Sequence, residues 1–107
     1  MSSGNVLEIN LTKLAAEKLL RELAMDSSKV VFSIHARGRG TQRKISNLQI
    51  LECLRKGRII EGPAKAVKGN WEIKLTYLSA GEPINVVAAL DWQPKLGNYV
   101  IVITTFK

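Results

Sequence analysis

Apolar side chains recur with the spacing of a helix near the N-terminus. Ala16, Leu19 and Leu23 fall at intervals of three and four residues, while charged residues fill the other faces. This pattern is typical of an amphipathic helix, which we place at Asn10–Ala24. The Asn10 side chain is expected to cap the first turn, and polar turn-forming residues follow the last one.

A second helix start lies in the middle of the chain. Ser46 and Gln49 have the spacing of a capping box, in which each side chain bonds a backbone N–H of the first turn. Ile45 and Ile50 are expected to pack against each other across that turn. Gly57 is expected to end the helix, so the helix is short.

The remaining apolar segments predict strands. Trp71–Tyr77 alternates apolar and polar side chains, which indicates one buried and one wet face. Ile84–Leu90 and Tyr99–Phe106 are apolar on both faces, so we expect both faces to be covered. Two shorter candidates are Lys29–Ile34 and Arg58–Glu61, and Gly62-Pro63 is expected to close the second of them.

The order of these elements predicts the fold class. Helices come first and consecutive strands last, which indicates an α+β domain. We expect the N-terminal helix and the short second helix to pack on a mostly antiparallel sheet of about four strands. The two apolar strands should pair at its centre, joined by a loop over Asp91–Asn98, with the first helix over one face. One domain is expected over residues 1–107, because that length holds one core.

Cysteine usage and hydropathy predict the compartment. Cys53 is the only cysteine, so no intramolecular disulfide can form, as is usual in a reducing environment. Residues 1–10 lack the basic and apolar stretches of a signal peptide, and the longest apolar runs are too short to span a bilayer. We therefore expect a soluble, cytoplasmic protein without a membrane partner.

The distribution of charge adds a candidate partner. Residues 1–28 carry three basic and four acidic residues, a net −1, and residues 75–107 carry two of each. Residues 29–74 carry eleven basic and three acidic residues, a net +8, which accounts for the whole excess of the chain's +7. Such a field attracts phosphate-rich partners such as RNA or DNA. The alternative is a solvated basic surface that aids solubility.

The segment from His35 to Lys44 is the candidate functional site. His35, Arg39 and Arg43 are spaced so that a helix would point all three to one side, which would suit phosphate chemistry. The imidazole can transfer a proton near neutral pH, and guanidinium groups hold phosphate. Arg37 and Lys44 add charge for nucleic-acid binding. Gly38 and Gly40 weaken a helix, so a flexible basic loop and a purely structural histidine remain alternatives.

Other chemistry has little support in the sequence. Gly38-Arg39-Gly40-Thr41-Gln42-Arg43 lacks the last glycine of a dinucleotide-binding fingerprint, and no Walker A motif is present. One histidine and one cysteine cannot build a zinc site without carboxylates, and no ligand spacing indicates one. Cys53 is expected to be packed rather than reactive. No metal or cofactor is predicted.

The chain resembles a known family. The pattern Ser33-x-His35-Ala36-x-x-Arg39-x-x-x-Arg43-x-Ile45-Ser46 is followed by a helix with Leu54 and Gly57, then Val86–Asp91 and Val102–Thr104. This pattern resembles the bacterial domain-of-unknown-function family 4258, which is grouped with RelE-like and barnase-like toxin domains. The chain departs from it at Gly40 and Lys44, where members often carry an apolar residue and a glycine.

The resemblance implies a helix-plus-antiparallel-sheet fold and a metal-independent ribonuclease toxin with an acidic antitoxin as partner. His35 would then act as acid or base, and Arg39 and Arg43 would clamp the phosphate. The second proton carrier stays open among the side chains Glu61, Tyr77, Asp91, Tyr99 and a lysine. Two other hypotheses stand beside the ribonuclease: a non-enzymatic module that binds RNA, DNA or an acidic protein, and a domain whose basic segment only keeps it soluble.

Overall fold

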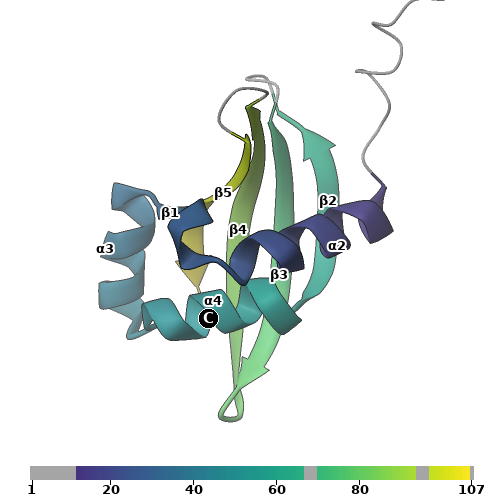
Figure 1. The fold of residues 1–107 in the computed structure, drawn as a ribbon. Coiled ribbons are helices and arrows are strands. Elements are labelled where there is room, and N and C mark those ends of the chain that lie inside the picture. Colours follow the sequence, from purple (N-terminus) through teal and green to yellow (C-terminus); the bar gives the residue numbers. More distant parts are fainter. Residues whose placement is uncertain (1–11, 67–69, 94–96, 107) are drawn as a thin grey trace, which may run out of the picture.

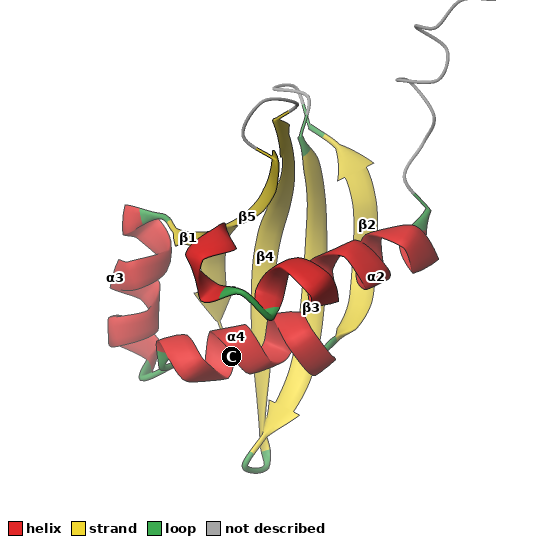
Figure 2. Cartoon of the chain, in the orientation of Figure 1, coloured by secondary structure: helices red, strands yellow, loops and turns green. Residues whose placement is uncertain are grey.

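The computed structural model describes residues 12–66, 70–93 and 97–106, and their fold is α+β (Figures 1 and 2). Helices α2 and α4 lie across one face of a five-stranded sheet, and α3 stands at one side of it (Figure 1). The elements in chain order are α2 (Lys13–Ala24), the 3-10 turn η1 (Ser27–Lys29), β1 (Val30–Phe32), α3 (Ile34–Arg43), α4 (Asn47–Lys56), β2 (Arg58–Lys65), β3 (Trp71–Ser79), β4 (Glu82–Gln93) and β5 (Gly97–Phe106).

The sheet has the strand order β1-β5-β4-β3-β2. Strands β2 to β5 pair antiparallel with their neighbours, and Val86 opposes Thr105 in the β4–β5 pair. The predicted antiparallel pairing of the two apolar strands is therefore confirmed. The fifth strand is β1, which pairs parallel with β5 and places Val31 opposite Ile101.

The first elements begin and end differently from the prediction. Thr12 caps α2 by accepting a hydrogen bond from Ala15 N at 3.1 Å, so the helix starts at Lys13. Asn10, the predicted cap, lies outside the described residues. The predicted strand Lys29–Ile34 is shorter, because Ile34 already belongs to α3.

The later strands are longer than predicted. Gly62-Pro63 does not close β2, which continues to Lys65 through a cis peptide bond and two shifts of register against β3. An edge strand tolerates this, because its outer N–H groups need no partner in the sheet. β4 runs to Gln93 and β5 starts at Gly97, so the predicted loop Asp91–Asn98 is too long at both ends.

The core lies between the sheet and helices α2 and α4. Leu20 of α2 and Leu54 of α4 are fully buried against Leu75 and Val86 of the sheet. Ile101 alternates with buried neighbours on β5 and is only half-buried on the opposite face. Ala89 of β4, which pairs with Ile101, is buried on that same face, so the predicted covering of both faces is complete on the helix side and partial on the other.

Helix α4 is built as the sequence predicts. Ser46 Oγ accepts from Gln49 N at 3.1 Å, and the Gln49 side chain accepts from Ser46 N at 2.9 Å. Ile45 and Ile50 are both buried at its start, and Gly57 ends it. Across 12–66, 70–93 and 97–106, no helix combines the length and the hydropathy needed to cross a bilayer.

Candidate nucleic-acid interface

The segment that the sequence left open between helix and loop is helix α3. Ser33 caps it by accepting from Ala36 N at 3.0 Å, and the same hydroxyl donates to Ile103 O of β5 at 3.0 Å. One side chain therefore starts the helix and fixes that start to the sheet. Since the cap satisfies a backbone donor that would otherwise be free, it offsets part of the cost of two glycines in the helix.

Gly40 serves the end of α3 rather than disrupting it. The chain leaves the helix through Lys44 in the left-handed region, with φ 58°, and Ile45 N donates to Gly40 O at 2.8 Å. A Cβ atom on Gly40 would lie 3.0 Å from Ile45 O. A glycine therefore allows the chain to fold back tightly here, and buried Ile45 leads directly into α4.

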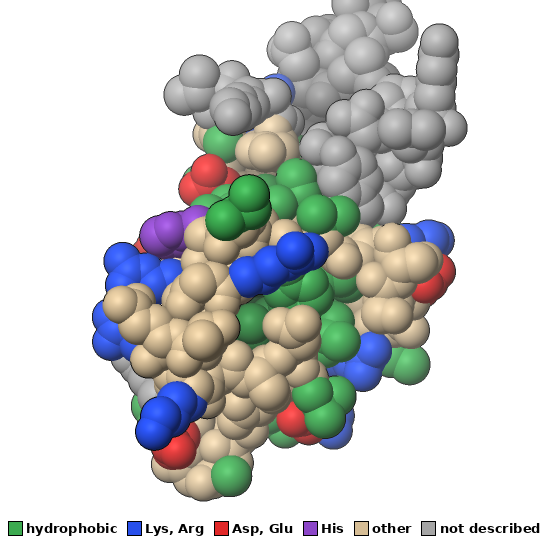
Figure 3. Space-filling model, turned by 90° about the vertical axis from the view of Figure 1, so that its left-hand side faces the viewer, with side chains coloured by type: hydrophobic (Ala, Val, Ile, Leu, Met, Phe, Trp, Pro, Cys, Tyr) green, Lys and Arg blue, Asp and Glu red, His purple; other side chains and the backbone are tan. Residues whose placement is uncertain are grey.

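The basic side chains of α3 face solvent. Ala36 and Gly40 are buried on its inner side, and the helix makes extensive contact with β5. Arg39 is half-buried, and exposed cationic or imidazole side chains are those of His35, Arg37, Arg43 and Lys44. Glu17 pairs with Arg21 and Glu61 with Lys74, so neither of these ion pairs neutralises a side chain of α3. Figure 3 shows this side of the molecule, with Lys and Arg side chains beside the imidazole and again near the middle of the face.

One hollow beside α3 contains the predicted histidine. It is an open depression of about 720 Å³ lined by His35, Gly38, Arg39, Thr41 and Gln42, and we call it the His35 hollow. Arg39 donates to Gln42 Oε1 at 3.3 Å, which holds the guanidinium along the helix. The structure thus brings His35 and Arg39 to one hollow.

Arg43 is not among the side chains that line the His35 hollow. It stands in the last turn of α3, eight residues after His35, which corresponds to a rise of about 12 Å along the helix axis. Residues eight apart also differ by about 80° around that axis. The structure therefore does not bring Arg43 into one hollow with His35 and Arg39, although the spacing predicted that all three point to one side.

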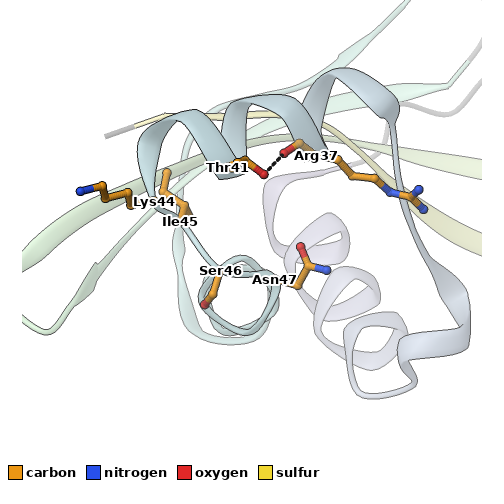
Figure 4. A pocket seen from close by; sticks show the side chains of 7 residues that line it. Arg37, Thr41, Lys44, Ile45, Ser46 and Asn47 are labelled. Carbon is orange, nitrogen blue, oxygen red and sulfur yellow. Dashed lines mark hydrogen bonds between the residues drawn. The ribbon is translucent and has the colours of Figure 1, made fainter.

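A second hollow lies on the other flank of α3, between it and the start of α4. It measures about 470 Å³, and we call it the Lys44 hollow; it is lined by Arg37, Gly40, Thr41, Lys44, Ile45, Ser46 and Asn47. Figure 4 shows the Arg37 and Lys44 side chains extending toward opposite ends of this hollow. Thr41 is common to both hollows, and its hydroxyl donates to Arg37 O at 3.1 Å.

Among the candidates for a second proton carrier, Glu61 and Tyr77 line neither hollow. Glu61 is on β2 and pairs with Lys74 at 3.9 Å, near the sheet edge opposite to β1. Tyr77 of β3 packs against the core. The side chains of Asp91 and Tyr99 lie outside the part of the chain that can be described. Lys44 is the one lysine at either hollow, and it lines the hollow that His35 does not.

Cys53 is packed, as the sequence predicts. It is fully buried, and its Sγ lies 3.8 Å from Ile84 O. Burial raises the pKa of its thiol to about 12, while the nearby positive charge of Arg21 acts weakly in the other direction. A thiol with such a pKa is not a nucleophile at neutral pH.

Sequence reasoning missed Thr41 and Gln42 as parts of the interface. Gln42 follows His35 by seven residues and Arg39 by three, so the spacing of a helical face could have found it. Thr41 follows Arg37 by four residues and precedes Lys44 by three, so a helical spacing also relates these three side chains on the other flank. Both side chains are uncharged, so the charge pattern of the segment does not indicate them.

Comparison with known proteins gives one match. The model of a protein family described as "Domain of unknown function (DUF4258)" matches residues 32–107, well over half of the chain. Searches of curated proteins and of solved structures find no match. The matched region starts at Phe32 and so contains α3 with both of its hollows.

Proposed function

The chain belongs to the DUF4258 family, and we propose from its own surface that it binds nucleic acid in the cytoplasm through helix α3. One observation carries the proposal: α3 presents a run of cationic side chains to solvent, and no acidic residue lies between His35 and Ser46. Phosphates are the commonest anions that bind such a surface.

The distribution of charge around the molecule supports the proposal. The ion pairs described above use acidic side chains on α2 and β2, which leaves the charge of α3 without a partner among described residues. Basic residues that serve only solubility need not gather on one helix. Here Arg37, Arg39, Arg43 and Lys44 follow one another within eight residues.

Binding at two salt concentrations tests the proposal. Labelled RNA and DNA should bind at low salt, and the affinity should fall steeply as salt rises, because each phosphate contact releases counterions. Arg37→Ala and Arg39→Ala should each weaken binding and lower the salt slope by about one. Arg58→Ala is the matched control, since Arg58 is an exposed arginine, as Arg37 is, on the far edge strand β2. Equal losses in all three variants would contradict the assignment to α3.

A second candidate function is metal-independent cleavage of RNA, as in a RelE-like or barnase-like toxin. The observation that favours it is the shared hollow of His35 and Arg39. In that reaction the ribose 2′-oxygen attacks the adjacent phosphorus and its proton passes to a base. The bond to the 5′-oxygen breaks, that oxygen takes a proton from an acid, and a 2′,3′-cyclic phosphate remains. Imidazole would serve one of these transfers, and guanidinium would stabilise the charged phosphorus centre.

Separate measurement of binding and cleavage tests this candidate. His35→Ala should spare binding and lower a cleavage rate about 10²- to 10⁴-fold, because proton transfer matters only as the bond breaks. Arg39→Ala should lower both. Cleavage that His35→Ala leaves unchanged would show that the activity does not come from this hollow. An acidic antitoxin, if one exists, should compete with RNA for α3.

A further inference from the structure

The two arginines at the middle of α3 lie on opposite flanks of the helix. Arg37 lines the Lys44 hollow and Arg39 lines the His35 hollow. Helical residues that are two positions apart differ by about 200° around the helix axis, so the two guanidinium groups point in nearly opposite directions. Gly38 lies between them at the outer crest of the helix, where it is exposed.

The outer crest of the helix, formed by Ile34 and Gly38 between the two flanks, carries no charge, and Gly38 adds no side chain to it. An added Cβ on Gly38 would meet no atom within 4 Å, so the crest is open to solvent. Ile34, which shares this side of the helix, has 87% of its surface exposed. A helix of this shape has phosphate-binding groups on both sides and a neutral, partly apolar edge in the middle.

This arrangement matches the cross-section of one kind of nucleic acid. The major groove of B-form DNA is about 12 Å wide, and an α-helix with its side chains is about 10–12 Å across. A helix that lies in this groove has a sugar–phosphate backbone on each side and base edges, including thymine methyl groups, in front of it. The major groove of A-form RNA is too narrow to admit a helix.

We propose that α3 lies in the major groove of double-stranded DNA, with one phosphate backbone at the His35 hollow and the other at the Lys44 hollow. This inference rests on the proposed function and names its substrate class. On the second flank Arg37 and Lys44 are seven residues apart, about 10 Å along the axis, so they reach different phosphates of one strand. Ile34 and Gly38 then face the bases.

Binding to a set of nucleic acids that share one sequence but differ in groove shape tests the inference. The probes are a labelled 20-base-pair DNA duplex, the RNA duplex of the same sequence, each single strand, and the DNA duplex with glucosylated 5-hydroxymethylcytosine, whose sugars fill the major groove. We expect the plain DNA duplex to bind at least about tenfold more tightly than every other probe. A ligand that fills only the minor groove should not displace the protein.

Two variants test the placement of the flanks. Arg37→Ala and Arg39→Ala should each weaken binding to the DNA duplex and lower its salt slope by about one, because each loses a phosphate on a different strand. Arg58→Ala on β2 should leave both unchanged. Melting temperatures of all variants would show whether the fold is kept.

The outcomes separate this inference from the function on which it rests. Equal binding of glucosylated and plain DNA, equal binding of the RNA duplex or a single strand, or loss from one arginine variant only would overturn the groove placement and leave nucleic-acid binding intact. Absence of binding to every probe at low salt would remove both. Binding of polyglutamate in place of every nucleic acid would show that the basic helix serves an acidic protein.

Discussion

Arg21 and Arg55 each bind the carbonyl end of the other's helix. Arg21 of α2 donates to Arg55 O and, at 2.8 Å, to Gly57 O at the end of α4. Arg55 of α4 donates in return to Ala24 O, the last residue of α2, at 2.7 Å. Carbonyl groups at a helix end lack partners within the helix and carry its negative pole. The exchange therefore satisfies both ends and ties the two helices that cover the sheet.

Removing this exchange should destabilise the fold. Arg21→Ala and Arg55→Ala should each lower the free energy of unfolding by about 1–3 kcal/mol, because hydrogen bonds to a charged donor are lost and carbonyls stay partly buried. The double variant should lose less than the sum, since one change removes part of what the other would. Urea unfolding of the wild type, the two single variants and the double variant measures these free energies. Strictly additive losses would mean that the two arginines act independently.

The two glycines of α3 should respond in opposite ways to the same substitution. Gly38→Ala should raise the free energy of unfolding by up to about 1 kcal/mol, because alanine favours the helix and meets free space. Gly40→Ala should lower it, because its Cβ would lie 3.0 Å from Ile45 O. Thermal unfolding of both variants checks the pair. If Gly40→Ala were as stable as Gly38→Ala, this result would contradict the close approach of Gly40 to Ile45 at the end of α3.

The capping box of α4 should contribute measurably to stability. Ser46→Ala removes the acceptor of Gln49 N and should cost about 1 kcal/mol. Ser46→Asp keeps an acceptor at the same place and should restore most of the loss. Ser27→Ala provides a serine control, because Ser27 is an exposed residue of the turn η1. Chemical denaturation of the three variants shows whether stability depends on a hydrogen-bond acceptor at the cap position or on the loss of any serine hydroxyl.

The Cys53 thiol should be unreactive in the native state and should make stability fall at alkaline pH. Its folded pKa of about 12 lies above the ordinary value of 9.0, so the native state holds its proton longer than the unfolded state. Below pH 9 both states are protonated and the thiol has no effect. Between pH 9 and 12 it should lower the free energy of unfolding by up to about 1.4 kcal/mol per pH unit.

Comparison with Cys53→Ala isolates this contribution, because lysines and tyrosines titrate in both proteins alike. The difference in unfolding free energy between wild type and variant should shrink from pH 9 upward. A disulfide reagent at pH 8 should modify the native protein only after denaturant is added. Rapid modification of the folded protein would contradict the buried position of the thiol.

The sequence predicted those parts of the fold that depend on neighbouring residues. The capping box of Ser46 and Gln49 and the alternation around Ile73 are local patterns, and both are found in the structure. The pairing of β1 with β5 is not local, because three residues of β1 meet strand residues some seventy positions later. No pattern within a short stretch of sequence indicates such a contact, so the sequence predicted a strand over Lys29–Ile34 but not its parallel pairing with β5.

The candidate site was predictable in its residues but not in its geometry. The charge run predicted which side chains gather, and the spacing of His35 and Arg39 indicated their common hollow. Whether Gly38 and Gly40 allow a helix depends on the Ser33 bond to Ile103 and on the turn at Ile45, which are tertiary contacts. The division of the cations between two flanks follows only once that helix is known.

The hydrogen bond from Ser33 to Ile103 also determines when, during synthesis of the chain, helix α3 becomes fixed to the sheet. A chain emerging from the ribosome has made the whole of α3 long before it makes Ile103 of β5, which follows Ser33 by 70 residues. Domains fold as their elements become available during synthesis, so the Ser33 hydrogen bond to Ile103 forms only after β5 has been made. A chain in which β5 has not yet been made therefore carries the cations of α3 without the contact that fixes the start of this helix to the sheet.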